Sequence, residues 1–113
     1  MFFSKRKYGK YKKVDMRTHY SEIRSFLDNI CTCNLFRSDR NPLKDRMNEE
    51  CLFSNETLSI KGDRFSVGDR NFDIYPNPFD TIKPSAYIGQ DLIFEVPRGY
   101  DGDCIYYRLV KIS

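Results

Sequence analysis

Two alternating apolar runs in the last third of the chain predict a β-hairpin. They flank Asp101-Gly102, a dipeptide typical of tight two-residue turns in which both central residues take positive φ. A turn centred there places Leu109 opposite Phe94 on an apolar face. On the other face, Arg108 lies opposite Glu95 as an opposite-charge pair. The pattern favours this register because a slip of one residue would move every side chain to the wrong face.

Three shorter alternating runs predict a β-meander before this hairpin. Residues 57–61, 64–68 and 71–75 alternate, and Gly62-Asp63 and Asp69-Arg70 separate them as turns. The apolar residues of these runs are expected to share one buried face. They are Leu58, Ile60, Phe65, Val67, Phe72 and Ile74.

Helical spacing of apolar residues appears in the first half of the chain. Over about residues 18–31 these residues form one stripe, and Thr18 is placed to cap the first turn. Asn41-Pro42 is a helix start signal and predicts a second helix over about residues 42–52, with a narrower apolar stripe. The stripe of the first helix consists of Tyr20, Ile23, Phe26, Leu27, Ile30 and Cys31.

These elements predict an α+β fold: a mainly antiparallel sheet of about four to six strands, with two helices near the N-terminus packed on one face. The 113 residues are expected to form a single domain. If the helices cover one face only, the other face presents Glu95, Tyr106 and Arg108 to solvent or to a partner.

The composition of the chain indicates where in the cell the protein acts. No run approaches the ~18–20 apolar residues that a membrane span needs, and the charged N-terminus lacks the apolar core of a signal peptide. We therefore expect a cytoplasmic protein with no membrane partner, in which the four cysteines are reduced. Cys31 and Cys33 lack the spacing of a zinc knuckle, and His19 is the only histidine. No metal or other cofactor is expected.

The N-terminal segment, residues 1–13, is basic. Residues 1–20 hold seven cationic residues against one acidic residue. Such a segment is either a flexible terminus, an edge strand guarded by lysines, or a contact for nucleic acid, with phosphates on the cations and bases on the rings. For the nucleic-acid alternative the candidate residues are Lys5, Arg6, Lys7, Tyr8, Lys10, Tyr11, Lys12 and Lys13.

Common catalytic motifs are absent from the sequence, which contains no GxSxG, P-loop, GxGxxG, HExxH or paired CxxC. We therefore expect a non-enzymatic protein-binding module, a small inhibitor or immunity-type protein that neutralises a specific partner such as a toxin. Tyrosine and arginine are enriched at such interfaces. The candidate contact residues, in the hairpin and in or beside a proline-rich segment over 76–85, are Phe79, Tyr87, Arg98, Tyr100, Asp101, Asp103 and Tyr106.

A less favoured alternative is a small metal-independent ribonuclease, which would need no motif of these kinds. Its first candidate catalytic residues are His19, Arg98, Tyr100 and Tyr106. A basic toxin nuclease as the target of an inhibitor is disfavoured, because the chain after residue 20 is only mildly acidic, with fifteen acidic and twelve basic residues.

Overall fold

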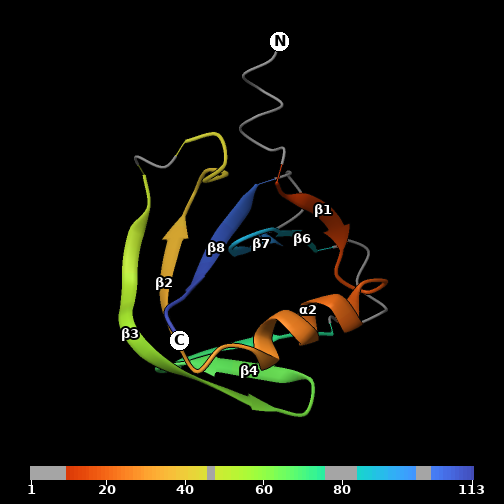
Figure 1. Cartoon of the computed structure of the whole chain (residues 1–113). Coiled ribbons are helices and arrows are strands. Elements are labelled where there is room, and N and C mark those ends of the chain that lie inside the picture. Colours follow the sequence, from red (N-terminus) through yellow and green to blue (C-terminus); the bar gives the residue numbers. More distant parts are fainter. Residues whose placement is uncertain (1–9, 46–47, 76–83, 99–102) are drawn as a thin grey trace.

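A computed structural model describes residues 10–45, 48–75, 84–98 and 103–113 of the chain. These residues form eight antiparallel strands and one helix (Figure 1). Their order in the sheet is β1-β6-β7-β8-β2-β3-β4-β5. The elements are β1 (Lys12–Asp15), α2 (Tyr20–Asp28), β2 (Thr32–Ser38), β3 (Glu50–Lys61), β4 (Arg64–Val67), β5 (Arg70–Asp73), β6 (Ser85–Ile88), β7 (Leu92–Pro97) and β8 (Cys104–Lys111).

The expected α+β fold, with four to six strands and two helices, is therefore wrong: the described residues form mostly antiparallel sheet with a single short helix. The start signal at Asn41 produces one turn only. The Asn41 carbonyl accepts hydrogen bonds from the backbone N–H groups of Lys44 and Asp45, both at 2.9 Å, and its side chain caps Leu43. The chain then enters β3 at Glu50, where pairing with β2 replaces the predicted helix.

The first predicted helix is confirmed, in shorter form, as α2. Ile23 and Leu27 are fully buried, so the periodic stripe faces the core, except for Cys31, which follows the helix and is exposed. Thr18 does not cap the helix: its hydroxyl donates to the Asp15 carbonyl, and His19 occupies the N-cap position. No helix in the described ranges is long and apolar enough to cross a membrane.

The sheet curls so that strands far apart in its order face each other. Phe65 on β4 lies 5.4 Å, centroid to centroid, from Phe94 on β7, although β8, β2 and β3 separate those strands in the sheet order. Helix α2 lies across the open side, between β1 and β4 in Figure 1. Its Glu22 pairs with Lys12 of β1, and its Tyr20 hydroxyl donates to Asp63 in the β3–β4 turn.

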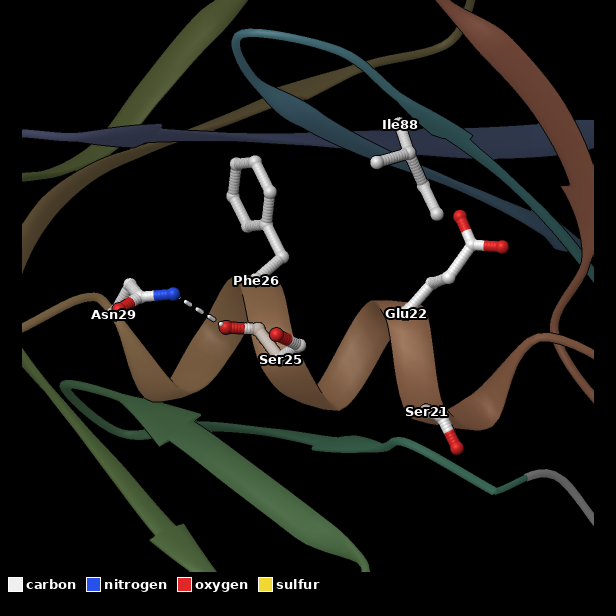
Figure 2. A pocket seen from close by; sticks show the side chains of 6 residues that line it. All are labelled: Ser21, Glu22, Ser25, Phe26, Asn29 and Ile88. Carbon is white, nitrogen blue, oxygen red and sulfur yellow. Dashed lines mark hydrogen bonds between the residues drawn. The ribbon is translucent and has the colours of Figure 1, made fainter.

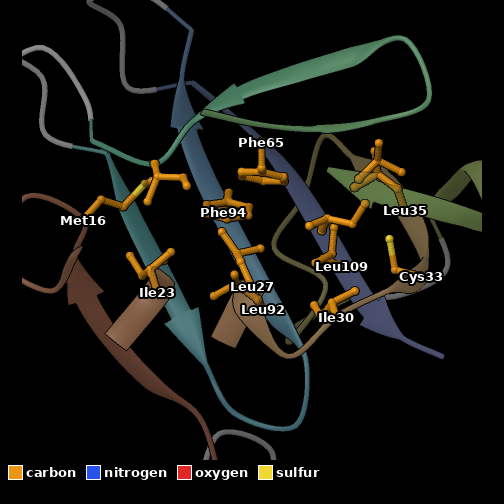
Figure 3. Packing of buried hydrophobic residues seen from close by; sticks show 14 of the residues in the cluster. Met16, Ile23, Leu27, Ile30, Cys33, Leu35, Phe65, Leu92, Phe94 and Leu109 are labelled. Atoms are coloured by element: carbon orange, nitrogen blue, oxygen red, sulfur yellow. The ribbon is translucent and has the colours of Figure 1, made fainter. Parts of the chain in front are cut away.

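The inner face of the curled sheet and the inner face of α2 enclose one apolar core (Figure 3). Side chains from α2, β2, β4, β7 and β8 meet there, and the prediction that the helix stripe packs against the strands is confirmed. Because side chains alternate along a strand, the neighbours of these core residues point to the outer face. Asp91, Ile93, Glu95 and Arg108 lie on that outer face.

The predicted hairpin is present, but its register is shifted by two residues. Leu109 lies opposite Leu92 rather than Phe94, and Glu95 lies opposite Tyr106. The expected pairing of Glu95 with Arg108 is therefore wrong. The Arg98 N–H donates to the Asp103 carbonyl at 2.9 Å, so the connection is longer than a two-residue turn. A shift of two residues keeps every side chain on its predicted face, because the period of a strand is two.

The meander is confirmed as β3, β4 and β5, with Leu58 opposite Val67 and Ile60 opposite Phe65. Strand β1 lies at one edge of the sheet. Strand β2 is an interior strand of the sheet. It lies between β8 and β3, and its Leu35 is fully buried.

Candidate functional site

The outer face of the sheet carries a cluster around Glu95, which we call the open cluster: Lys13, Tyr87, Glu95 and Tyr106. The Tyr87 hydroxyl donates to Glu95 Oε1 at 3.3 Å, and Lys13 Nζ lies 3.5 Å from Oε2. Tyr106 of β8 lies directly opposite Glu95 in the sheet. A tyrosine and a lysine from two neighbouring strands thus contact one carboxylate of β7, and a second tyrosine lies beside it.

Strand order explains why these side chains converge. Ser85 of β6 and Tyr106 of β8 are the cross-strand partners of Glu95, and Lys13 of β1 is the partner of Tyr87. The Asn41 side-chain amide, from the turn after β2, donates to the Tyr87 oxygen at 3.2 Å. The Lys13 ammonium also lies over the Tyr87 ring, 5.5 Å from its centroid.

Electrostatics keep the phenols of the open cluster neutral. Burial, and then the Glu95 charge, raise the pKa of Tyr106 and the pKa of Tyr87 above the usual tyrosine value. The same two causes raise the pKa of the Cys104 thiol. Partial burial opposes the charge of Lys13, but Glu95 and Tyr87 outweigh it and raise the pKa of this lysine. The cluster therefore offers neutral hydroxyl donors and one ammonium group, and no activated nucleophile.

A second outer-face cluster, the closed cluster, consists of Arg108, Glu49 and Asp91. The Arg108 guanidinium donates to both Glu49 oxygens, at 2.7 and 2.9 Å, and to Asp91 at 3.1 Å. It also lies 4.4 Å from the centroid of the Phe36 ring. The side chains of Arg108, Glu49 and Asp91 are 11%, 8% and 9% exposed. This cluster is sealed and ties the segment before β3 to the sheet.

The predicted partner-binding residues divide into three groups. Tyr87 and Tyr106 meet at Glu95. Arg98 and Asp103 lie at the end of the hairpin, where both are exposed and Arg98 lies 4.0 Å from Asp39. The remaining three, Phe79, Tyr100 and Asp101, lie outside the described residues.

The basic N-terminal segment is described from Lys10 onward, and Lys10 is exposed. Tyr11 donates to Asp91 at 3.2 Å, Lys12 pairs with Glu22 and Lys13 pairs with Glu95. These three side chains, predicted as nucleic-acid contacts, are engaged with carboxylates of the fold. Lys5, Arg6, Lys7 and Tyr8 lie outside the described residues.

The histidine and the cysteines do not assemble into a recognisable reactive site. His19 Nδ1 has local contacts, 2.8 Å to the Thr18 hydroxyl and 3.3 Å to the Asp15 carbonyl. Burial raises the pKa of the Cys33 thiol to about 11, while Cys31 is exposed. Within the described segments, no group of three or more His, Cys, Asp or Glu side chains could hold a metal ion.

A groove that the sequence did not reveal lies between α2 and β6 (Figure 2). It has a volume of about 410 Å³, and it opens to solvent beside the helix. The helical spacing of Glu22, Phe26 and Asn29 would have placed these residues on one side of α2, but only the fold brings Ile88 of β6 opposite them. The lining residues are Ser21, Glu22, Ser25, Phe26, Asn29 and Ile88.

No protein-family model matches the chain, and searches of curated proteins and of solved structures found no significant match.

Proposed function

We propose that this protein is a non-enzymatic binding module of the inhibitor or immunity type, which neutralises a specific partner protein such as a toxin. The observation that supports the proposal is the open cluster. Glu95 holds Tyr87 and Lys13 in place, yet the Lys13 side chain is 54% exposed. A partner that docks on this face meets side chains that are already ordered.

Preorganisation is what favours protein binding here. Immobilising a rotamer-rich side chain at an interface costs about 0.5–1.5 kcal/mol. Tyr87 is held by both Glu95 and Asn41, so much of this cost is met during folding. Tyrosine supplies a large rigid contact surface with a polar end, the composition typical of interface hot spots.

The exposed charges at the end of the hairpin extend this surface. Arg98 lies beside Asp39, and Asp39 also lies 3.8 Å from Arg37. Exposed ion pairs of this kind contribute little to stability, but charges at an interface rim steer association and reject wrong partners. We assign Arg98 and Asp103 to the rim of the proposed interface and Tyr87 and Tyr106 to its centre.

We further propose that the protein acts in the cytoplasm. The support is that its four cysteines, all of which lie in described segments, form no disulfide. Thiols that remain reduced are typical of proteins in reducing compartments.

The proposal is tested by capture followed by measured binding. The immobilised protein is incubated with lysate of its source at low and high salt, with and without nuclease. A protein retained at high salt after nuclease treatment is then titrated calorimetrically against the wild type. The same titration is made with the double variant Tyr87→Phe/Tyr106→Phe, which keeps both rings and loses both hydroxyls.

We expect the double variant to bind the captured partner about tenfold more weakly, which corresponds to ~1.4 kcal/mol. Tyr75→Phe is the matched control, because Tyr75 is an exposed tyrosine outside the open cluster. A partner that binds the double variant as tightly as the wild type would place the interface elsewhere. Recovery of nucleic acid alone, lost at high salt, would instead support the basic N-terminal segment as the binding element.

A further inference from the structure

We propose that the groove between α2 and β6 binds an arginine side chain of a partner protein, with the guanidinium group held between the Glu22 carboxylate and the Phe26 ring. This inference goes beyond the proposed function, because the groove is built from α2 and Ile88. Adjacent residues of a strand point to opposite faces, so Ile88 and Tyr87 lie on opposite faces of β6.

The groove lining has the chemistry of a site for a cation with an apolar stem. Phe26 and Ile88 are its apolar walls, and Glu22 is its one charged lining residue. In Figure 2 the Glu22 carboxylate is directed toward Ile88, and the Phe26 ring rises from the same side of the helix one turn further along. A cation placed there contacts the carboxylate and the face of an aromatic ring together, a combination that favours guanidinium.

The rest of the lining supplies hydrogen-bond acceptors. Ser21 and Ser25 carry hydroxyl groups at the rim, both exposed. The Asn29 amide nitrogen already donates to the Ser25 carbonyl at 2.9 Å. A guanidinium group has five N–H donors and no acceptor, which suits a lining that offers carboxylate and hydroxyl oxygens. An anion would meet the Glu22 charge instead.

Lys12 of the same chain already contacts the Glu22 carboxylate from one side. Lys12 Nζ lies 3.0 and 3.1 Å from the two oxygens of Glu22, yet the two side chains remain 57% and 48% exposed. An ion pair with this exposure is weak and is displaced at little cost. Lys12 therefore shows that the site takes a cation, and it also acts as a competitor for an incoming arginine.

The test uses acetyl-arginine methylamide as the probe and needs no identified partner, so its failure is distinguishable from failure of the proposed function. Amide and methyl chemical shifts of the labelled full chain are followed by NMR. We expect saturable shifts confined to Glu22, Ser25, Asn29 and Ile88. The matched probe is the citrulline analogue, which has nearly the same shape and no charge, and it should leave these signals unchanged.

Two substitutions with opposite expected effects sharpen the test. Glu22→Gln should weaken arginine binding about tenfold, because it removes the charge but keeps the shape. Lys12→Gln should strengthen it, by up to about fivefold, because it removes the competitor. Both positions are exposed, so both variants are expected to fold, and the unperturbed core signals of Ile23 and Leu27 confirm this.

Several outcomes would overturn the proposal. Equal shifts with the arginine and citrulline probes would show that charge plays no part. Shifts spread over exposed carboxylates such as Asp73 would show unspecific ion binding. Lys12→Gln binding more weakly than the wild type would mean that Lys12 is not a competitor, and the assignment of the cation site would be wrong.

Discussion

The open and closed clusters lie on the same face of the sheet, and β8 contributes a residue to each of them, but they differ in how far solvent reaches them. The closed cluster buries a guanidinium group between two carboxylates, all three about one-tenth exposed. The open cluster holds Glu95 at 17% exposure against a lysine that is 54% exposed. Both are ordered by hydrogen bonds, so order alone does not distinguish a structural network from a binding surface. The two differ in whether a partner can reach the side chains.

The difference arises from the segment between β2 and β3. Glu49, just before β3, reaches across to Arg108 and completes the closed cluster. Asn41, just after β2, makes a single contact with Tyr87 at the edge of the open cluster. In the intervening turn, Pro42 and Leu43 are buried. The same segment thus seals one cluster and leaves the other accessible.

The largest expected effect is the loss of Arg108. Arg108→Ala leaves Glu49 and Asp91 buried without their cation, and removing one partner of a buried ion pair typically costs about 3–5 kcal/mol. We expect a loss of this size in the free energy of unfolding, measured by urea denaturation. Arg108→Lys, which restores a charge but not the fork of donors, should fall between this variant and the wild type. A loss below ~1 kcal/mol would show that water reaches the cluster.

A matched pair of glutamates compares the two clusters directly. Glu49→Gln removes a buried charge bound twice by Arg108, and we expect about 1.5–3 kcal/mol of destabilisation. Glu95→Gln keeps an acceptor for the two tyrosines and loses a partly exposed ion pair, so its effect should remain below ~1 kcal/mol. Chemical denaturation of both variants in one buffer is the measurement. Equal losses would contradict the distinction between closed and open clusters.

Much of the sheet was predictable because its signals are local. Helical and alternating patterns located α2, the meander and the hairpin, and they assigned the inner and outer faces correctly. The register of the hairpin was not predictable in this way, because a two-residue shift leaves the pattern of faces unchanged. That shift determines which residues form each cluster, because it places Tyr106 beside Glu95 and moves Arg108 to the closed cluster.

The prediction of a second helix was wrong for a different reason. The capping signal at Asn41 is real and forms a turn, but local propensity is a weak prior that tertiary pairing overrides. From Glu50 to Thr57 the chain pairs with β2, and a narrow apolar stripe on a helix could not match this pairing. The convergence of Tyr87, Lys13 and Tyr106 likewise needed the strand order β1-β6-β7-β8, which no local pattern contains.

Alkaline pH should lower the free energy of unfolding through Tyr106 of the open cluster. The pKa of Tyr106 is raised in the folded state, so above the unfolded tyrosine value of about 10 the folded protein binds more protons than the unfolded chain. This contribution to stability is complete below that pH, and it is lost as pH rises through the folded pKa, by up to ~1.4 kcal/mol per pH unit. Tyr106→Phe should flatten the decline measured by denaturation between pH 9 and pH 11. Tyr75→Phe, which removes an exposed phenol outside both clusters, is the matched control, and an equal slope in wild type and Tyr106→Phe would contradict the assignment.

The smallest expected effect separates two neighbouring lysines on opposite faces of β1. Lys12→Gln breaks a pair with Glu22, which is 48% exposed, whereas Lys13→Gln breaks a pair with Glu95, which is 17% exposed. Both losses should be below ~1 kcal/mol in the free energy of unfolding. Lys13→Gln should be the larger, because solvent screens its partner less. High salt should remove most of the Lys12 effect and leave more of the Lys13 effect. The reverse order would mean that Glu95 relies on its two tyrosines rather than on its lysine, and that Lys13 is free to contact a partner.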